Sequence, residues 1–124
     1  FPKYIICGYS IIKNKKEIED KNVIKVVKNY KDELIYFSRS KIPANKKKKN
    51  QIKFFKQVCV YCFSPYQLKY FYKSKRGRLE KEEDVELLRF LELGFKIKMC
   101  KVSPTISVDV PTDIKKVENF LKKR

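Results

Sequence analysis

The sequence predicts an α/β fold in which a mixed β-sheet carries helices on its faces. Strand-like and helix-like segments alternate along the chain, one segment is apolar on both sides, and two short β-rich segments are close enough to form a hairpin. The chain has 124 residues, of which 43% are hydrophobic and only three are glycine, so it can bury one compact core. Residues 1–124 are therefore expected to form a single domain.

Six segments have the pattern of strands. Residues 4–12 form a nearly continuous apolar run, which is typical of a strand buried on both faces. Residues 22–28 and 34–37 are separated by a polar stretch that suits a hairpin, so this part of the sheet should be antiparallel. Three further strands are predicted: a buried one over 57–63, an alternating one over 95–100 and a very short one over 106–110.

Helical segments are predicted between these strands. The charged segment 13–20 is typical of a short helical turn or loop. Ser64 and Pro65 have the character of an N-cap and a first-turn proline, so a short helix should cover 66–72.

The second half of the chain contains the clearest helical pattern. Over 79–93, apolar residues recur at helical spacing, acidic residues crowd the first turns, and Gly94 stands where a helix should stop. Pro111 then opens a last helix. Its apolar side is formed by Ile114, Val117, Phe120 and Leu121.

The charge of the chain raises an alternative function. Lysine and arginine number 31 against 14 acidic residues, a formal net charge of +17, and the loop over 39–56 carries eight cations and no acid. A protein this basic attracts polyanions, so a nucleic-acid-binding module is the alternative. The cations are spread along the chain and most are lysine, which suits base edges less well than arginine, so no nucleic-acid partner is expected.

The cysteine and histidine content restricts the chemistry. Histidine is absent, which removes the commonest general base and the commonest nitrogen ligand for metals. The pair Cys59 and Cys62 has no second pair to complete a zinc site, so these residues, Cys7 and Cys100 are expected to be reduced and semi-buried. The sequence has no apolar span of membrane length and no signal peptide pattern, so we expect a cytoplasmic protein without membrane contact.

Two residues stand where strands are predicted to end. Arg39, between two serines, could hold a carboxylate with its guanidinium, or it could simply point into solvent. Asp109, before the last helix, suits a hard cation such as Mg²⁺, although a helix-capping role explains it as well. Asp113 is better explained by the dipole of that helix.

Two further groups of residues allow both a functional and a structural interpretation. Glu80, Glu83 and Glu86 are three residues apart on the predicted helix, where they could face ligand hydroxyls or pair with Arg78 and Arg89. An aromatic stripe could stack bases but is more typical of a core. The stripe consists of Tyr66, Tyr70, Phe71 and Tyr72.

Several stretches, taken in order, resemble the bacterial CMP-Kdo synthetases, the 3-deoxy-manno-octulosonate cytidylyltransferases. The most specific stretch is Tyr-Phe-Ser-Arg-Ser-Lys-Ile-Pro at 36–43, and the match in spacing extends from residue 4 to residue 121. The other stretches are 22–27, 57–63, 79–80 with 86–94, and 107–113. The resemblance implies a three-layer, Rossmann-like nucleotidyltransferase fold with a mixed sheet.

The resemblance also implies a reaction and a set of site residues. The anomeric hydroxyl of a 2-keto sugar acid would attack the α-phosphate of CTP, and pyrophosphate would leave with Mg²⁺, in a pathway for lipopolysaccharide or capsule synthesis. Arg39 and Tyr61 match positions that contact the sugar acid, Glu86 matches an acid that faces sugar hydroxyls, and Asp109 matches a metal ligand. We expect Arg39, Tyr61, Glu86 and Asp109 to converge in one cleft.

The sequence departs from the family pattern in two ways. Gln57 replaces a histidine at a substrate-binding position and Leu87 replaces a glutamine, which indicates a rearranged pocket for Kdo, its 8-amino derivative or another ulosonic acid. The family's N-terminal third, with its CTP-binding loop, has no counterpart here. We therefore expect a sugar-binding and dimer-forming portion, a homodimer in solution, that does not turn over CTP by itself.

Overall fold

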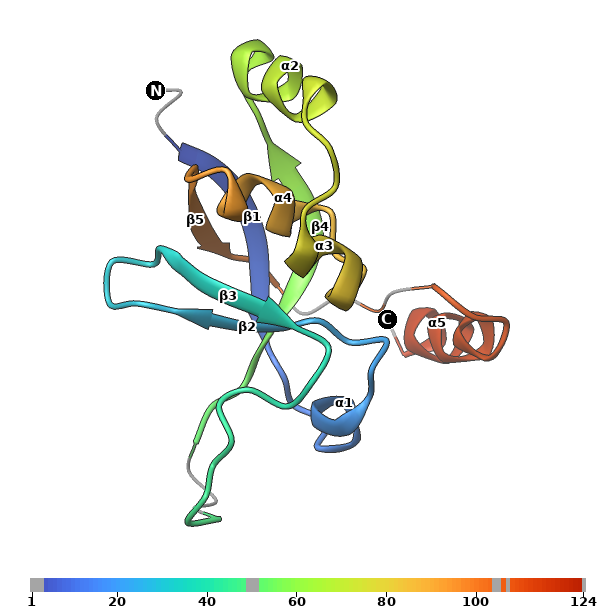
Figure 1. Ribbon diagram of the computed structural model, residues 1–124. Helices are drawn as coiled ribbons and strands as arrows, with labels where there is room; N and C mark the ends of the chain where they lie inside the picture. The colour runs from blue at the N-terminus through green and yellow to red at the C-terminus, as the bar shows by residue number, and fades with distance from the viewer. Residues whose placement is uncertain (1–3, 49–51, 104–105, 107, 124) are drawn as a thin grey trace.

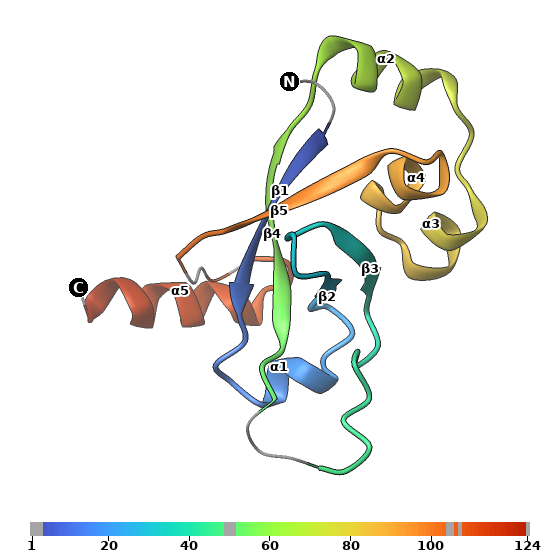
Figure 2. The same cartoon turned by 90° about the vertical axis from the view of Figure 1, so that its left-hand side faces the viewer.

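The structure is a computed structural model that describes residues 4–48, 52–103, 106 and 108–123. Five strands form one sheet in the order β3-β2-β4-β1-β5 (Figures 1 and 2). The pair β1–β5 is parallel and the other pairs are antiparallel, which confirms the predicted mixed sheet of an α/β fold. The strands are β1 (Tyr4–Ile11), β2 (Lys25–Lys28), β3 (Leu34–Ser38), β4 (Phe55–Cys62) and β5 (Lys96–Lys101).

Strand β1 runs between β4 and β5 and organises the sheet. Its apolar run is buried on both faces, as predicted, with Ile5, Cys7 and Tyr9 in the core and Ser10 buried on the other face. Next to Gly8 the pairing with β4 shifts register, because Cys7 pairs with Tyr61 whereas Gly8 pairs with Val58. A Cβ atom on Gly8 would lie 3.3 Å from the Val58 carbonyl oxygen, so glycine permits this close approach.

The predicted hairpin is formed by β2 and β3. Its turn is closed by the side chain of Asn29, which accepts hydrogen bonds from the backbone N–H groups of Lys31 and Glu33, both at 2.9 Å. The backbone N–H of Met99 in β5 donates to the carbonyl of Asp32 in this turn at 2.7 Å. The sheet is therefore curved, so that the turn between β2 and β3 contacts β5 although β3 and β5 are its two edge strands.

Two of the predicted helical segments are confirmed almost residue for residue. The segment 13–20 contains the short helix α1 (Lys16–Glu19), and α2 covers Pro65–Lys73. Ser64 caps α2 in a capping box with Gln67, and Pro65 occupies the first turn. No helix in the described ranges is long and apolar enough to span a membrane.

The single helix predicted over 79–93 is wrong, because two short helices replace it. Helix α3 (Arg78–Glu83) and helix α4 (Leu87–Glu92) are separated at Asp84, whose φ of 53° is left-handed. Glu92 near the end of α4 accepts hydrogen bonds from the backbone N–H groups of Leu79 and Glu80, so α4 caps α3. Apolar spacing alone cannot reveal such a break, because two short helices bury the same apolar residues that one long helix would bury.

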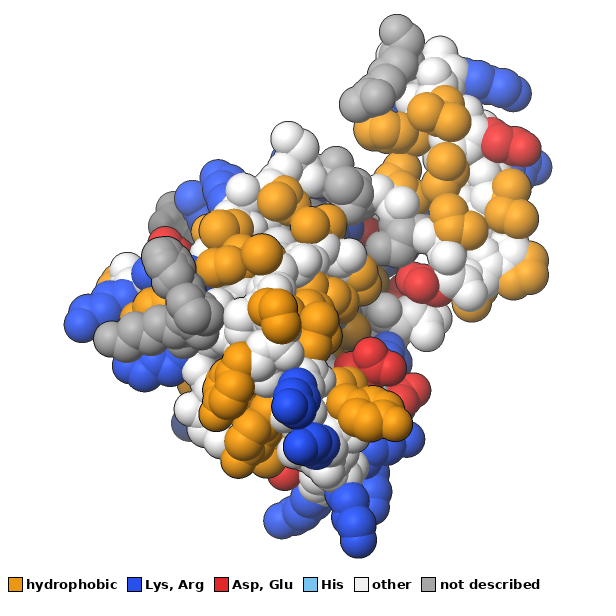
Figure 3. All heavy atoms as spheres, turned by 90° about the horizontal axis from the view of Figure 1, so that it is seen from above, with side chains coloured by type: hydrophobic (Ala, Val, Ile, Leu, Met, Phe, Trp, Pro, Cys, Tyr) orange, Lys and Arg blue, Asp and Glu red, His pale blue; other side chains and the backbone are white. Residues whose placement is uncertain are grey.

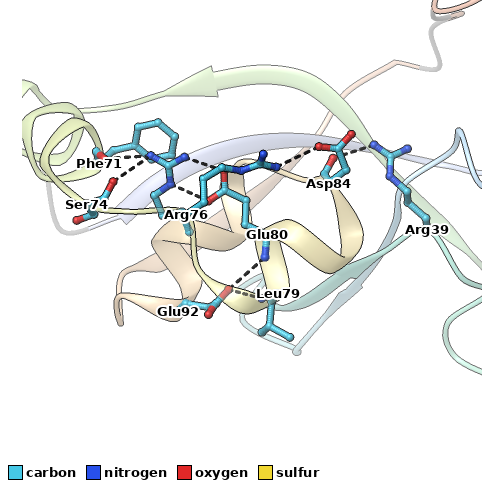
Figure 4. Close-up of polar contacts among 9 residues, drawn as sticks. Arg39, Phe71, Ser74, Arg76, Leu79, Glu80, Asp84 and Glu92 are labelled. Carbon is cyan, nitrogen blue, oxygen red and sulfur yellow. Dashed lines mark hydrogen bonds and ion pairs between the residues drawn. The ribbon is translucent and has the colours of Figure 1, made fainter.

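A buried ion pair joins α3, α4 and the end of α2 (Figure 4). Arg89 donates to both carboxylate oxygens of Glu80, at 2.7 and 2.8 Å, and Glu80 is 1% exposed. The guanidinium of Arg89 also lies 3.8 Å from the ring centroid of Phe71 and donates to the Phe71 carbonyl. Hydrogen bonds from Arg89, with the charges of Arg89 and Arg76, hold the pKa of Glu80 below its ordinary value.

Helices α3 and α4 cover one face of the sheet and enclose the core. Phe90 of α4 stacks on Phe63 and Phe71 and meets Phe95 edge-on, with ring centroids 4.9–5.8 Å apart. The rest of the core comes from both layers. It consists of Ile5, Cys7, Tyr9, Val26, Leu34, Phe37, Val85, Leu87, Leu88, Ile97 and Met99.

Other predictions about burial are wrong. The second half of β4, predicted to be buried, is exposed, and Tyr66, Tyr70 and Tyr72 of the aromatic stripe are exposed as well, since no described helix covers them. Figure 3, which views the molecule from above relative to Figure 1, shows exposed apolar side chains on that side and along the extension formed by α5. Cys7 is buried as expected, but Cys59, Cys62 and Cys100 are exposed; all four are free thiols.

The C-terminal region also differs from the expectation. Ile106, Val108 and Asp109 are not in a strand, and Ser107 lies outside the described residues. The predicted last helix is present as α5 (Thr112–Lys122), but it extends away from the sheet instead of packing on a face (Figures 1 and 2). Ile114 and Leu121 on its apolar side are 54% and 58% exposed.

We predict that Arg89→Leu lowers the free energy of unfolding by about 3–5 kcal/mol, because it leaves the buried Glu80 carboxylate without its main partner. Urea denaturation at neutral pH measures this loss. The matched control is Arg78→Leu, which removes an exposed arginine of α3 and should change the stability by less than about 0.5 kcal/mol. Equal losses for the two variants would contradict the role of the ion pair.

Candidate functional site

Arg39 lies directly after β3 and faces the corner between α3 and α4 (Figure 4). Its guanidinium donates to three backbone carbonyls: Nε to Glu83 at 2.5 Å, Nη2 to Asp84 at 2.9 Å and Nη1 to Lys21 at 2.9 Å. Its backbone N–H donates to the Glu83 carboxylate at 3.2 Å. Arg39 is thus neither free in solvent nor fully available to a ligand, because most of its donors fix the α3–α4 corner to the hairpin.

Gln57 and Tyr61 lie on the same face of β4 and contact each other. Gln57 Nε2 donates to the Tyr61 hydroxyl at 3.2 Å and lies 3.9 Å from the Cys7 sulfur. Partial burial raises the pKa of Tyr61, and a hydrogen bond with the Cys59 side chain and the negative charge of Glu86 raise it further. The phenol is therefore neutral and carries a proton that it can donate to a bound oxygen.

Glu86 is the member of the acidic series that stays available. Glu80 pairs with Arg89 and Arg76, and Glu83 accepts from Arg39, so both have structural partners. Glu86 is exposed at the start of α4, and its carboxylate has no hydrogen bond or ion pair within the described ranges. Its negative charge is among the smaller causes that raise the pKa of Tyr61.

Cys7 and Cys59 lie near Gln57 and Tyr61, although neither cysteine was predicted to belong to the site. Burial raises the pKa of Cys7 to about 12, and the Cys59 side chain contributes to raising the pKa of Tyr61. A signal was present in the sequence, since residues 57, 59 and 61 of an extended strand share one face. The partner strand that brings Cys7 to them could not be read from the sequence.

Asp109 lies apart from these residues. It is exposed, and its backbone N–H donates to the Asp113 carboxylate at 3.0 Å, as the N–H of Val110 does at 3.1 Å. These two bonds lower the pKa of Asp113, which confirms the structural interpretation of that residue. The described residues show no direct contact from Asp109 to Arg39, Tyr61 or Glu86, so their convergence in one cleft stays a prediction.

The donor set around Asp109 allows only a limited metal role. The described part of the chain contains no group of three acidic or cysteine side chains that could hold a metal ion. One exposed carboxylate suits Mg²⁺ as a single protein ligand, with phosphate oxygens and water completing the shell. Asp109 as a metal ligand therefore stays a prediction.

Two surface hollows in the described structure lie elsewhere. One of about 280 Å³ is lined by the hairpin turn, the end of α4 and the start of β5, and one of about 220 Å³ is lined by Tyr66, Tyr70 and the turn before β5. Neither is lined by a predicted site residue. Among the predicted site residues that the structure describes, Gln57 and Tyr61 are in contact on β4, Glu86 is exposed at the start of α4, and Arg39 binds the α3–α4 corner.

Comparison with known proteins gives one family. The family model described as "Cytidylyltransferase" matches residues 3–98. Relatives named 3-deoxy-manno-octulosonate cytidylyltransferase include that of Fusobacterium nucleatum, 38% identical over 110 residues, and that of Protochlamydia amoebophila, 35% identical over 114 residues. The alignments cover 88% and 90% of this chain but 44% of each relative, so the chain spans less than half the length of these proteins.

A solved structure agrees with this result. The structure of CMP:2-keto-3-deoxy-manno-octonic acid synthetase complexed with CTP matches with a TM-score of 0.84 and 26% identity. The match covers 97% of this chain and 49% of that chain. The whole arrangement of sheet and helices described above is therefore found in that protein, and the Rossmann-like fold expected from the sequence is confirmed.

We predict that Arg39→Leu lowers the free energy of unfolding by roughly 2–3 kcal/mol, because it removes three charge-assisted hydrogen bonds to backbone carbonyls. Thermal or urea unfolding measures this effect. Lys41→Leu is the control, since it removes a 3.8 Å ion pair with Glu19 and a cation–π contact with Phe54 at 5.8 Å, and should cost less than about 1 kcal/mol. Unchanged stability of Arg39→Leu would show that the corner does not depend on this residue.

Proposed function

The chain belongs to the cytidylyltransferase family, and we propose that it forms the sugar-acid-binding portion of an enzyme that joins CMP to a 2-keto sugar acid. The substrates would be CTP and Kdo, its 8-amino derivative or a related ulosonic acid. The observation that carries this proposal is the contact of Gln57 with Tyr61 on β4, on a fold that matches a CTP-bound CMP-Kdo synthetase. The names of the relatives support the same substrates.

Tyr61 and Glu86 would bind the polyol part of the sugar acid. The neutral phenol of Tyr61 donates one hydrogen bond, and the free carboxylate of Glu86 accepts one from a neighbouring hydroxyl. Gln57 holds the Tyr61 oxygen at 3.2 Å, which directs the phenol proton away from β4. A donor and an acceptor side by side suit vicinal hydroxyl groups, which sugar acids supply.

Arg39 would contribute charge at the other end of the ligand. Three of its five N–H groups are engaged with carbonyls, which leaves two for the sugar carboxylate. Because its other bonds are intramolecular, the guanidinium is already fixed in place before a ligand binds. Fixing it in advance reduces the entropy that binding costs.

In the proposed reaction, the anomeric oxygen of the sugar acid forms a bond to the α-phosphorus of CTP, and the bond from that phosphorus to pyrophosphate breaks. Bound Mg²⁺ would neutralise the charge of the phosphates, with Asp109 as one of its ligands. The residues of this chain bind and orient the sugar acid, which raises the effective concentration of the attacking oxygen. A cytoplasmic homodimer acting in lipopolysaccharide or capsule synthesis completes the proposal.

We predict that Tyr61→Phe and Glu86→Gln each weaken the binding of Kdo by about tenfold, because each removes one hydrogen bond to the sugar. Titration calorimetry on this chain measures the affinity without a need for turnover. Tyr72→Phe and Glu82→Gln are matched controls at exposed positions and should leave the affinity unchanged. Equal affinities in all four variants would remove these residues from the site.

We predict that Asp109→Asn lowers pyrophosphate release from CTP and Kdo by at least about 100-fold in the full-length protein, because the neutral amide binds Mg²⁺ poorly. Glu118→Gln, which neutralises an exposed acid of α5, is the control. Kdo binding should be unaffected by either change. Full activity of Asp109→Asn over a range of Mg²⁺ concentrations would contradict the metal role.

A further inference from the structure

Two thiols flank the Gln57–Tyr61 pair, and the geometry points to a thiol-modification site that the proposed function does not use. We propose that hydrogen peroxide oxidises the exposed Cys59 and that Cys7 then forms a disulfide with it. The inference rests on the pairing of β1 with β4 and on the contacts around Tyr61. It does not require that the chain binds a sugar acid.

The strand pairing places Cys59 beside Cys7. Cys7 pairs with Tyr61 and Gly8 pairs with Val58, so Cys59 and Val60 form a bulge opposite the step from Cys7 to Gly8. The Cys7 thiol lies 3.9 Å from the carbonyl oxygen of Val58, the residue directly before Cys59. Because Cys59 follows Val58 directly in the chain, this contact brings the backbone of Cys59 close to the Cys7 sulfur, although the residue that pairs with Cys7 is Tyr61.

Side-chain contacts connect the same two cysteines. The Cys7 sulfur lies 3.9 Å from Gln57 Nε2, which donates to the Tyr61 hydroxyl at 3.2 Å. The Cys59 side chain contributes to raising the pKa of Tyr61. Cys7 therefore lies beside the Gln57–Tyr61 pair from β1, and Cys59 lies between the two members of the pair along β4.

The two thiols differ in access, which assigns their roles. Cys59 is exposed, so peroxide reaches it directly. Cys7 is fully buried, and burial raises its pKa to about 12, so it does not react with oxidants from solution. A buried thiol beside an oxidised one reacts within the molecule, because its effective concentration is high.

The chemistry balances with one molecule of peroxide. The Cys59 sulfur attacks one oxygen of H₂O₂, the O–O bond breaks, and Cys59 sulfenic acid and water form. The Cys7 sulfur then attacks the Cys59 sulfur; the S–S bond forms, the S–O bond breaks, and the hydroxyl leaves as water with the Cys7 proton. Two thiols are oxidised by two electrons and peroxide is reduced to two molecules of water.

The disulfide would change the site around Tyr61. It removes the thiol that now contacts the Tyr61 phenol and the thiol that lies beside the Gln57 amide. It also fixes the bulge of β4, which carries Tyr61. If the proposed function holds, oxidation therefore weakens sugar-acid binding at the same face, and reduction restores it.

The chain contains its own controls. Cys62 pairs with Ile6 and Cys100 pairs with Gly8, and side chains at successive positions of a strand point to opposite faces. Both cysteines are exposed but lie on the face opposite Cys7. Peroxide reaches them as easily as Cys59, yet neither follows Val58, whose carbonyl the Cys7 thiol contacts.

The test treats the full chain with hydrogen peroxide, blocks the remaining thiols with N-ethylmaleimide and measures the intact mass and the tryptic peptides. We expect an intact mass about 2 Da below that of the chain with two N-ethylmaleimide groups, on Cys62 and Cys100, and a disulfide between the peptides 4–13 and 57–69. Because the second peptide contains both Cys59 and Cys62, fragment spectra must place the bond on Cys59. Cys59→Ser and Cys7→Ser should lower the yield of this disulfide at least about tenfold, whereas Cys62→Ser and Cys100→Ser should not.

The outcomes separate this inference from the proposed function. A bond to Cys62 or Cys100, a disulfide only between molecules, or stable Cys59 sulfenic or sulfinic acid would overturn the proposal. Circular dichroism of Cys7→Ser and Cys7→Ala shows whether loss of the disulfide in these variants reflects misfolding. If these variants are misfolded, the disulfide yield of Cys59→Ser, a substitution at an exposed position, decides the test. A Cys7–Cys59 bond in a chain that does not bind Kdo would leave the inference standing and contradict the proposed function alone.

Discussion

The position of the helical layer depends on one buried carboxylate. Glu80 carries a negative charge at 1% exposure, and such a charge is tolerated only because Arg89 neutralises it with two short hydrogen bonds. Arg89 also reaches the end of α2, and Arg76 bridges Glu80 to Asp84 at the α3–α4 corner. Arg39 then ties the carbonyl of Asp84 to the end of β3. Arg89, Arg76 and Arg39 thus fix the α3–α4 corner, next to which Glu86 is exposed.

The second determinant of the site is the irregular pairing of β1 with β4. Regular pairing would present alternate residues of β4 evenly along the strand, whereas the bulge places Cys59 and Tyr61 close together beside Cys7. Gly8 makes this possible because a side chain there would press against the Val58 carbonyl. The polar pair and the two thiols are therefore consequences of one local departure from the ladder.

Much of the fold followed from the sequence alone. The apolar run of β1, the hairpin of β2 and β3, the capping box before α2 and the glycine after α4 are local features, and local propensities decided each of them. The split between α3 and α4 was missed because it depends on two tertiary contacts: Arg39 binds the corner at Asp84, and Glu92 of α4 binds the backbone at the start of α3. The exposure of β4 was missed because apolar composition does not show whether another layer covers a strand.

The candidate site shows the same division. The sequence by itself determined which residues belong to the family pattern, including Tyr61 and Glu86, since residue type and spacing along the chain carry that information. Only the tertiary structure decided that Arg39 donates to three backbone carbonyls, that Gln57 turns to Tyr61, and that Cys7 pairs with Tyr61 across the bulge. Contacts between segments fifty residues apart depend on strand order, register and bulges, which arise when the whole sheet assembles and are not encoded in any one segment.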